Sequence, residues 1–356
     1  MAEHRATSGL LAARPYLIAI GLLVAALAGV VVGLALTAGP TPTSTGLVRP
    51  PAAVEYGLPV ARALLDLAAL TTIGLSLLPM VIGVDTARGT AAERVLTGTR
   101  SAAVLSSVAV LSSAVWAVAA GVSLALQTVD WNPAAPLTFG LIATFASTVG
   151  VGQALAIVTV AAGVQTVVWL LAVRGGQRVR AEPRLLLAVF TVLPLPATGH
   201  AGDATSALHG IAMVSIQLHV IAAMCWTGGL LAVCVTVAAQ RSLLASALPR
   251  FSKLATVCLL TVAGTGVLNG LVQLSSVPGV HWYTALLATG YGWLVIGKVL
   301  CAGALAAIGG GIRMRLLPLI VKHRSTGLLG WAAVELAVMG LAYGLAAVLT
   351  RTPVVR

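Results

Sequence analysis

The stretch HGIAMVSIQLHVIAAMCWTGGL, residues 209–230, has the length of one membrane-spanning helix and contains no Asp, Glu, Lys or Arg. It nevertheless contains two histidines, two methionines and a cysteine. Polar and metal-binding side chains are costly inside a bilayer, so each of them is a candidate functional group. Imidazole nitrogens together with soft sulfur atoms suit copper better than magnesium or calcium. The stretch therefore predicts a transmembrane helix that handles a metal ion.

The composition of the chain predicts an integral membrane protein. Of its 356 residues, 59% are hydrophobic and 8% are charged. Membrane lipid can cover the apolar side chains that a soluble protein would have to bury in a core. The formal net charge is +12, but the basic residues lie in short loops between apolar runs, which argues against nucleic acid as a partner. The sequence has no phosphate-binding glycine loop, which argues against an ATPase, and we expect a non-enzymatic membrane protein.

Nine apolar segments are long enough to cross a membrane at 1.5 Å of rise per residue. We therefore predict an all-α fold, a polytopic transmembrane bundle of about nine helices. The first segment is longer than the apolar part of a signal peptide and is interpreted as an anchor. The fifth is the shortest and contains two prolines near its end. The nine segments lie near residues 15–39, 58–84, 101–127, 148–173, 183–199, 208–239, 251–276, 290–312 and 328–350.

The distribution of lysine and arginine predicts the orientation of these segments. Placing the N-terminus in the cytoplasm puts 16 of the 21 basic residues on the inner side, in agreement with the positive-inside rule. Only Arg49, Arg351 and Arg356 then lie outside, and Arg62 and Lys298 lie within spans. We therefore expect a multi-pass plasma membrane protein whose C-terminus is outside.

The metal-binding candidates of residues 209–230 form two groups along the predicted helix. His209 and Met213 are four residues apart and lie on one face. His219 lies about 15 Å deeper than His209 and about 80° around the helix, so one ion cannot bind both on a straight helix. The spacing predicts two copper sites in series, with Met224 and Cys225 as further soft donors.

His200 lies in the short loop before this helix, where it could help His209 to capture a cation from outside. Each histidine also has a simpler interpretation. His200 can be a solvated loop residue, His209 an anchor at the membrane surface, and His219 a hydrogen-bonding group between helices. The residues alone leave both interpretations open.

Three charged residues in other spans are also predicted to be buried: Asp66, Lys298 and Glu335. Asp66 and Lys298 lie at a depth similar to that of His219, counted from the outer ends of their spans. A buried lysine must be paired or lose its proton, so we expect Asp66 or Glu335 to be the partner of Lys298. The alternative is a purely structural ion pair.

Five ordered stretches of the chain resemble the copper resistance D (CopD) family of membrane proteins, and spans two to nine agree with the family's eight-helix arrangement. The resemblance divides the chain into an N-terminal anchor span with an outer Pro-rich connector (1–57) and an eight-helix transmembrane domain (58–353). The stretches are GHAGDA (199–204), LHVIAAMCWTGGLLA (218–232), RFSKLATVCLLTVAGTGVLNG (250–270), LLATGYGWLVIGKVL (286–300) and VELAVMGLAYGLAAVLTRTP (334–353).

This resemblance implies a copper-handling membrane protein that moves copper from the outer side inward. The soft donors favour Cu(I) as the ion. Among the matching positions, His200 and His219 are plausible ligands, whereas Trp226, Gly228 and Gly229 are expected to serve helix packing. Lys298 and Glu335 are the other matching positions. The implied partners are a small periplasmic copper-binding protein and a cytochrome oxidase assembly module.

Two other functions stay open at this point. The protein could deliver copper to a terminal cytochrome oxidase, or help to assemble that oxidase, without transporting copper itself. A haem-binding electron carrier is less well supported, because bis-histidine haem needs histidines from two spans at equal depth. His209 and His219, the histidines placed within spans, share one helix.

Overall fold

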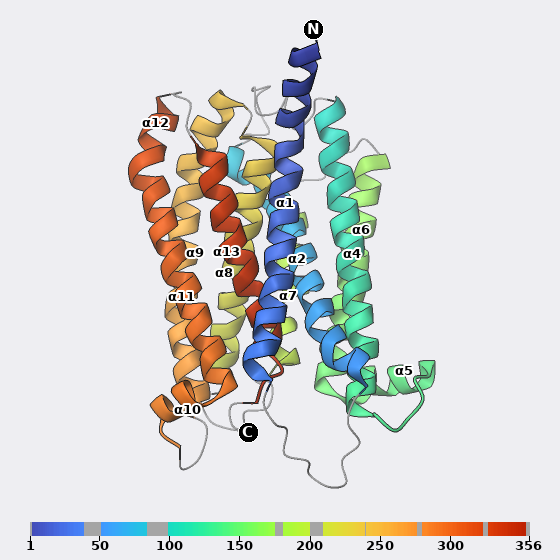
Figure 1. Cartoon of the computed structure of the whole chain (residues 1–356). Helices are drawn as coiled ribbons and strands as arrows, with labels where there is room; N and C mark the ends of the chain where they lie inside the picture. Colours follow the sequence, from blue (N-terminus) through green and yellow to red (C-terminus); the bar gives the residue numbers. More distant parts are fainter. Residues whose placement is uncertain are drawn as a thin grey trace.

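A computed structural model describes residues 2–38, 51–83, 99–174, 181–199, 209–238, 240–275, 280–322 and 327–353. Every regular element in these ranges is helical, which confirms the predicted all-α transmembrane bundle (Figure 1). The elements are α1 (Ala2–Thr37), α2 (Ala52–Ile82), α4 (Thr99–Trp131), α5 (Phe139–Thr148), α6 (Gly150–Arg174), α7 (Ala181–Val192), η1 (Leu195–Thr198), α8 (His209–Thr236), α9 (Arg241–Leu274), α10 (Trp282–Ala288), α11 (Gly290–Gly311), η3 (Ile312–Leu316), α12 (Leu317–Val321) and α13 (Leu328–Leu349).

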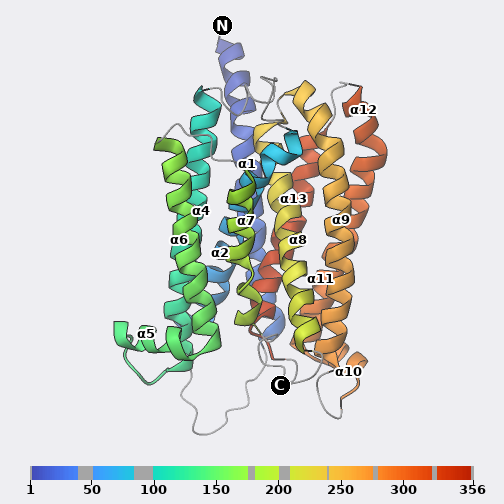
Figure 2. The ribbon, with the colours of Figure 1, turned by 180° about the vertical axis from the view of Figure 1, so that it is seen from behind.

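Within the described residues, eight helices are long and apolar enough to cross a membrane, one fewer than the nine predicted segments. The difference lies in the fifth segment, where α7 has only 12 residues and is followed by the 3₁₀ turn η1. Pro194 and Pro196 lack the backbone N–H that an α-helix would need here. α7 nevertheless runs lengthwise in the bundle (Figure 2). The two chain ends lie at opposite ends of the bundle (Figure 1), as an odd number of crossings requires.

α2 lies in the middle of the bundle, and most of its residues are buried. It packs against α4, α7, α8 and α13, with α4 and α6 to one side and α9 and α11 to the other (Figures 1 and 2). Large apolar side chains on these outer helices are about two-thirds exposed, among them Val160, Leu260 and Leu300. Such a surface suits lipid, because the helices already satisfy their own backbone hydrogen bonds.

Glycines make the closest helix contacts. Gly74 of α2 and Gly228 of α8 meet backbone to backbone, and a Cβ atom added to Gly228 would overlap the carbonyl group of Leu70. α1 packs on α13 in the same way, since a Cβ atom on Gly344 would overlap the carbonyl oxygen of Ala26. Small residues permit this close approach in membranes. The position of α8 is therefore fixed by its contact with α2.

The end of the bundle at which the C-terminus lies is called here the C-terminal end. α8 begins at this end with His209 and runs toward the opposite end (Figure 1). The short helix α5 lies across it, with Phe139 87% exposed, as expected for a segment at a membrane surface. Arg351 donates to Asp130 at 2.7 Å and so ties the end of α13 to α4.

Candidate metal site

His219 is held against α9, in the half of α8 nearer to the C-terminal end. Its Nδ1 atom lies 3.0 Å from Oγ1 of Thr265, and the side chain is half-buried. Gly266 leaves room for the imidazole, because a Cβ atom there would already lie 3.4 Å from Cε1 of the ring. His219 therefore makes an interhelical hydrogen bond, as its simpler interpretation requires.

The same hydrogen bond indicates which ring nitrogen of His219 carries the proton, and the Val262 backbone is a further hydrogen-bonding neighbour of the ring. The Thr265 hydroxyl also lies within hydrogen-bond distance of the Thr261 carbonyl oxygen, to which it donates its single proton. Its oxygen must then accept a proton from Nδ1–H of His219. In this neutral tautomer Nε2 carries the lone pair, which is the form that binds metal. Metal-bound histidines are commonly oriented by such a second hydrogen bond, so the contact with α9 is compatible with metal binding.

The other predicted donors on α8 lie on both sides of His219. Met213 is half-buried and six residues closer to the C-terminal end, about 9 Å along the helix. His209 is the first residue of α8, but its side chain lies outside the described part of the structure, as does the whole of His200. The outer predicted site is therefore represented by Met213 alone.

Beyond His219, α8 enters the packed interior. Met224 is fully buried in the main apolar cluster, and the free thiol of Cys225 is half-buried against the same cluster. Trp226 is also buried. A Cβ atom added to Gly229 would lie 2.9 Å from Cε2 of Phe251. This part of α8 has closely packed surroundings, in contrast to the half-buried positions nearer the C-terminal end.

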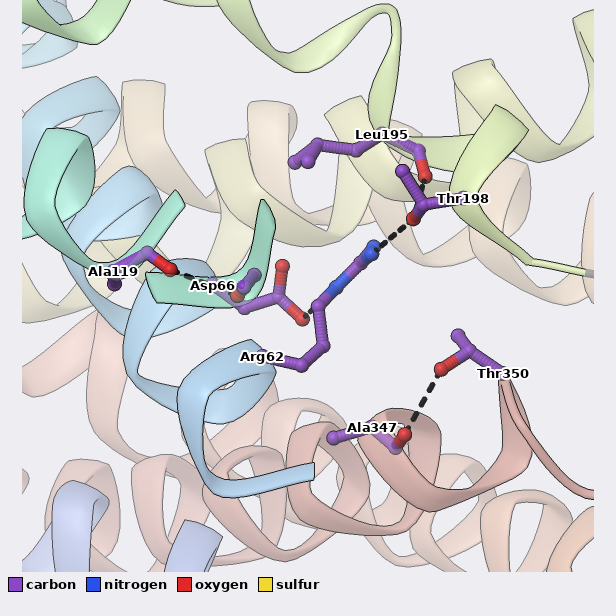
Figure 3. Close-up of polar contacts among 8 residues, drawn as sticks. Arg62, Asp66, Ala119, Leu195, Thr198, Ala347 and Thr350 are labelled. Carbon is purple, nitrogen blue, oxygen red and sulfur yellow. Dashed lines mark hydrogen bonds and ion pairs between the residues drawn. The ribbon is translucent and has the colours of Figure 1, made fainter. Parts of the chain in front are cut away.

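A polar cluster joins α2 to η1 near the C-terminal end (Figure 3). Arg62 donates from Nε to Oδ2 of Asp66 at 3.2 Å and from Nη1 to Oγ1 of Thr198 at 2.6 Å. Asp66 is 5% exposed, and its Oδ1 atom has no hydrogen-bond partner in the described part of the chain. Arg62 thus anchors η1, the turn that precedes His200 in the sequence.

Lys298 of α11 is close to both the polar cluster and His219. It is half-buried, and it interacts electrostatically with Asp66 and with His219. Among the described residues no acid makes a direct salt bridge with it; Asp66 pairs through Oδ2 with Arg62. Of the two acids expected to pair with Lys298, Asp66 is the one that interacts with it. The two side chains do not form a direct salt bridge.

Glu335 of α13 lies in different surroundings, in the other half of the bundle. It is 4% exposed, and it interacts with the side chains of Trp226 and Cys234. The contact with Trp226 falls short of hydrogen-bond geometry. No basic side chain forms a salt bridge with Glu335 in the ranges that the structure describes. The two buried acids therefore have different electrostatic environments.

The structure brings His219, Lys298 and Asp66 into one electrostatic neighbourhood, in keeping with their similar predicted depths. Sequence reasoning missed Thr265 and Thr198, which orient His219 and Arg62. No sequence signal marks them, because threonines in membrane helices commonly bond to their own backbone. The described residues include no group of three or more His, Cys, Asp or Glu side chains that could hold a metal ion.

Two family models match the chain. The model described as "Copper resistance protein D-like, N-terminal domain" matches residues 53–211, and the model described as "Copper resistance protein D" matches residues 245–349. Residues 212–244, which include His219, lie between the two matched ranges. No curated protein matches the chain. No solved structure matches it either.

Proposed function

The chain belongs to the copper resistance D family, and from this premise we propose that it moves copper across the plasma membrane from the outer side inward, by way of His219. Membership makes it a copper-handling membrane protein. The observation that supports the finer proposal is the contact of His219 Nδ1 with Thr265 inside a membrane-length helix, since a proton on Nδ1 would leave the lone pair on Nε2 for a metal.

Copper is the substrate in this proposal, taken as Cu(I). In the proposed orientation the N-terminus is cytoplasmic and the C-terminal end of the bundle faces outward, as the basic residues indicate. His200, His209 and Met213 would then capture the ion, and His219 would receive it about 9 Å deeper than Met213. Imidazole and thioether donors suit this soft cation.

Lys298, in its protonated form, would give His219 a property that transport needs. A cation at His219 is repelled by a protonated Lys298, and Asp66 offsets this repulsion only in part because Arg62 already pairs with it. A transported ion must bind well enough to enter and weakly enough to leave. Imidazole binding opposed by a nearby positive charge meets both conditions.

Energy for transport would come from a copper gradient or from a partner, since the sequence has no ATPase motif. We propose a small periplasmic copper-binding protein as the donor on the outside. A cytochrome oxidase assembly module would be a recipient of the copper.

Copper flux into vesicles tests the proposal. Purified protein in lipid vesicles should accumulate Cu(I) inside faster than protein-free vesicles do, with competition from silver and little from zinc. Copper binding without any flux would contradict transport and would support the alternative, delivery to a terminal oxidase. An absorbance scan of the same protein should show no haem bands, and a haem spectrum would contradict the copper assignment.

A further inference from the structure

The contact between His219 and Thr265 fixes how α8 and α9 lie side by side, and it brings two cysteines to one level. The two helices are neighbours and run in opposite directions (Figure 2). Cys225 is six residues after His219 on α8, and Cys258 is seven residues before Thr265 on α9. At 1.5 Å per residue, both cysteines therefore lie about 10 Å from the contact, on its side away from the C-terminal end.

The two cysteines also lie toward the same interface. Cys258 shares a face of α9 with Thr265, because seven residues make nearly two helical turns. On α8, Cys225 lies one turn before Gly229, where an added Cβ atom would lie 2.9 Å from Cε2 of Phe251 on α9, and Phe251 shares the face of Cys258 at a spacing of seven residues. Cys258 belongs to the main apolar cluster, and Cys225 packs against that cluster. Both thiols are free, and they lie close enough for a negative charge on Cys258 to act on Cys225.

A hydroxyl group from a third helix lies beside the cysteines. The hydroxyl oxygen of Tyr343 on α13 is buried; the Thr227 side chain is its polar neighbour, but that contact falls short of hydrogen-bond geometry. It interacts electrostatically with both Cys225 and Cys258. A buried hydroxyl without a partner is costly, and a phenol O–H is a suitable donor to a thiolate. A donor with only this poor contact is available to a ligand-bound state in which one sulfur carries negative charge.

We infer that Cys225 and Cys258 form a Cu(I) site between α8 and α9, about 10 Å deeper than His219. The inference deepens the proposed function and rests on it for the arrival of copper from His219. Binding replaces the proton of one thiol by Cu(I), the second sulfur is a neutral donor, and the proton is released to water without electron transfer. The resulting site is neutral overall, as a low-dielectric environment favours. Two soft sulfur atoms suit Cu(I).

The other two cysteines provide matched controls. Cys234 is a neighbour of Glu335, and Cys301 is a neighbour of Lys298. Both are free and buried, like Cys258. A serine at either position makes the same chemical change as at the proposed site, without removing a proposed copper ligand.

Cu(I) binding and X-ray absorption of the full chain in detergent test the site. Cys225→Ser and Cys258→Ser should each weaken this binding roughly 100-fold or more, since even outer-shell partners of a metal are worth 10–100-fold, and should remove the copper–sulfur scattering of the pair. Cys234→Ser and Cys301→Ser should behave as wild type. Tyr343→Phe should weaken binding about tenfold and retain the copper–sulfur signal. Wild-type binding in both Cys225→Ser and Cys258→Ser would overturn the inference.

A second measurement needs no substitution. A membrane-permeant reagent that joins two nearby thiols should cross-link Cys225 to Cys258 in the wild-type protein, and added Cu(I) should protect them. Failure to cross-link would overturn the geometry. Failure of transport is distinguishable from failure of the site: copper–sulfur binding without flux contradicts the proposed function, whereas flux with no copper at the cysteines contradicts only the inference.

Discussion

The two halves of α8 differ in how their neighbours hold them. Nearer to the C-terminal end, Met213 and His219 are half-buried, and a side-chain hydrogen bond to Thr265 connects His219 to α9. From Met224 onward the helix is mostly buried, and Gly228 brings its backbone against that of α2. One half of the helix thus fixes its position in the bundle, while the other keeps metal-binding side chains partly accessible. The predictions below test this division, from the largest expected effect to the smallest.

The largest effect is expected at the contact between α8 and α2. Gly228→Leu should prevent recovery of folded protein, because the new side chain would overlap backbone atoms of α2 rather than a side chain that can move. Gly264→Leu on α9 is the control, since a Cβ atom there has nothing within 4 Å. Yield and thermal unfolding in detergent measure both. Wild-type stability of the Gly228→Leu protein would contradict the division of α8.

A buried charge pair should have the next largest effect. Asp66→Asn should lower the free energy of unfolding by about 3–5 kcal/mol, because it leaves Arg62 without its counter-charge. Arg62→Met together with Asp66→Asn should cost less than the sum of the two single changes. The same cycle with Lys298→Met tests the longer-range interaction. Coupling of Lys298 to Glu335 and none to Asp66 would contradict the arrangement described above.

Removing the hydrogen bond to His219 should affect copper more than stability. Thr265→Val should weaken Cu(I) binding about 10–100-fold, because the ring loses the acceptor that fixes its tautomer. Thr265→Ser keeps the hydroxyl and should restore most of the affinity. Competition with a Cu(I) chelator measures the binding constants. Equal affinities of the valine and serine proteins would show that Thr265 does not orient a ligand.

The smallest effect is expected at Met213. Met213→Leu conserves the volume and removes one thioether from a site that also has imidazole donors, so copper capture from outside should weaken about tenfold or less. Initial rates of copper binding at low concentration measure this change. A loss as large as that of a histidine variant would make Met213 a principal ligand.

The sequence was sufficient to predict the elements of this fold, since apolar segments and basic loops determine a membrane bundle almost by themselves. The fifth segment was the exception, because Pro194 and Pro196 shorten its helix to 12 residues. The similar depths of Asp66, His219 and Lys298 also followed from counting residues along spans.

The contacts of these residues could not be predicted in the same way. The pairing of His219 with Thr265, and of Arg62 with Thr198, depends on the relative rotation and register of two helices. Small residues set that register by allowing close approach, and a single sequence does not show which small residues meet. The same limit concealed the neighbourhood of Cys225 and Cys258.

The central claim is that copper crosses the membrane by way of His219. The most direct test measures copper transfer into vesicles by the His219→Ala protein. Wild-type, His209→Ala, His219→Ala and His281→Ala proteins are compared in vesicles; His281 is the control, because it is exposed and precedes α10 outside the spans. We predict that His219→Ala still binds copper from outside but transfers none, that His209→Ala loads poorly, and that His281→Ala behaves as wild type. Wild-type transfer by the His219→Ala protein would contradict the account, and identical defects in His209→Ala and His219→Ala would mean one site instead of two in series.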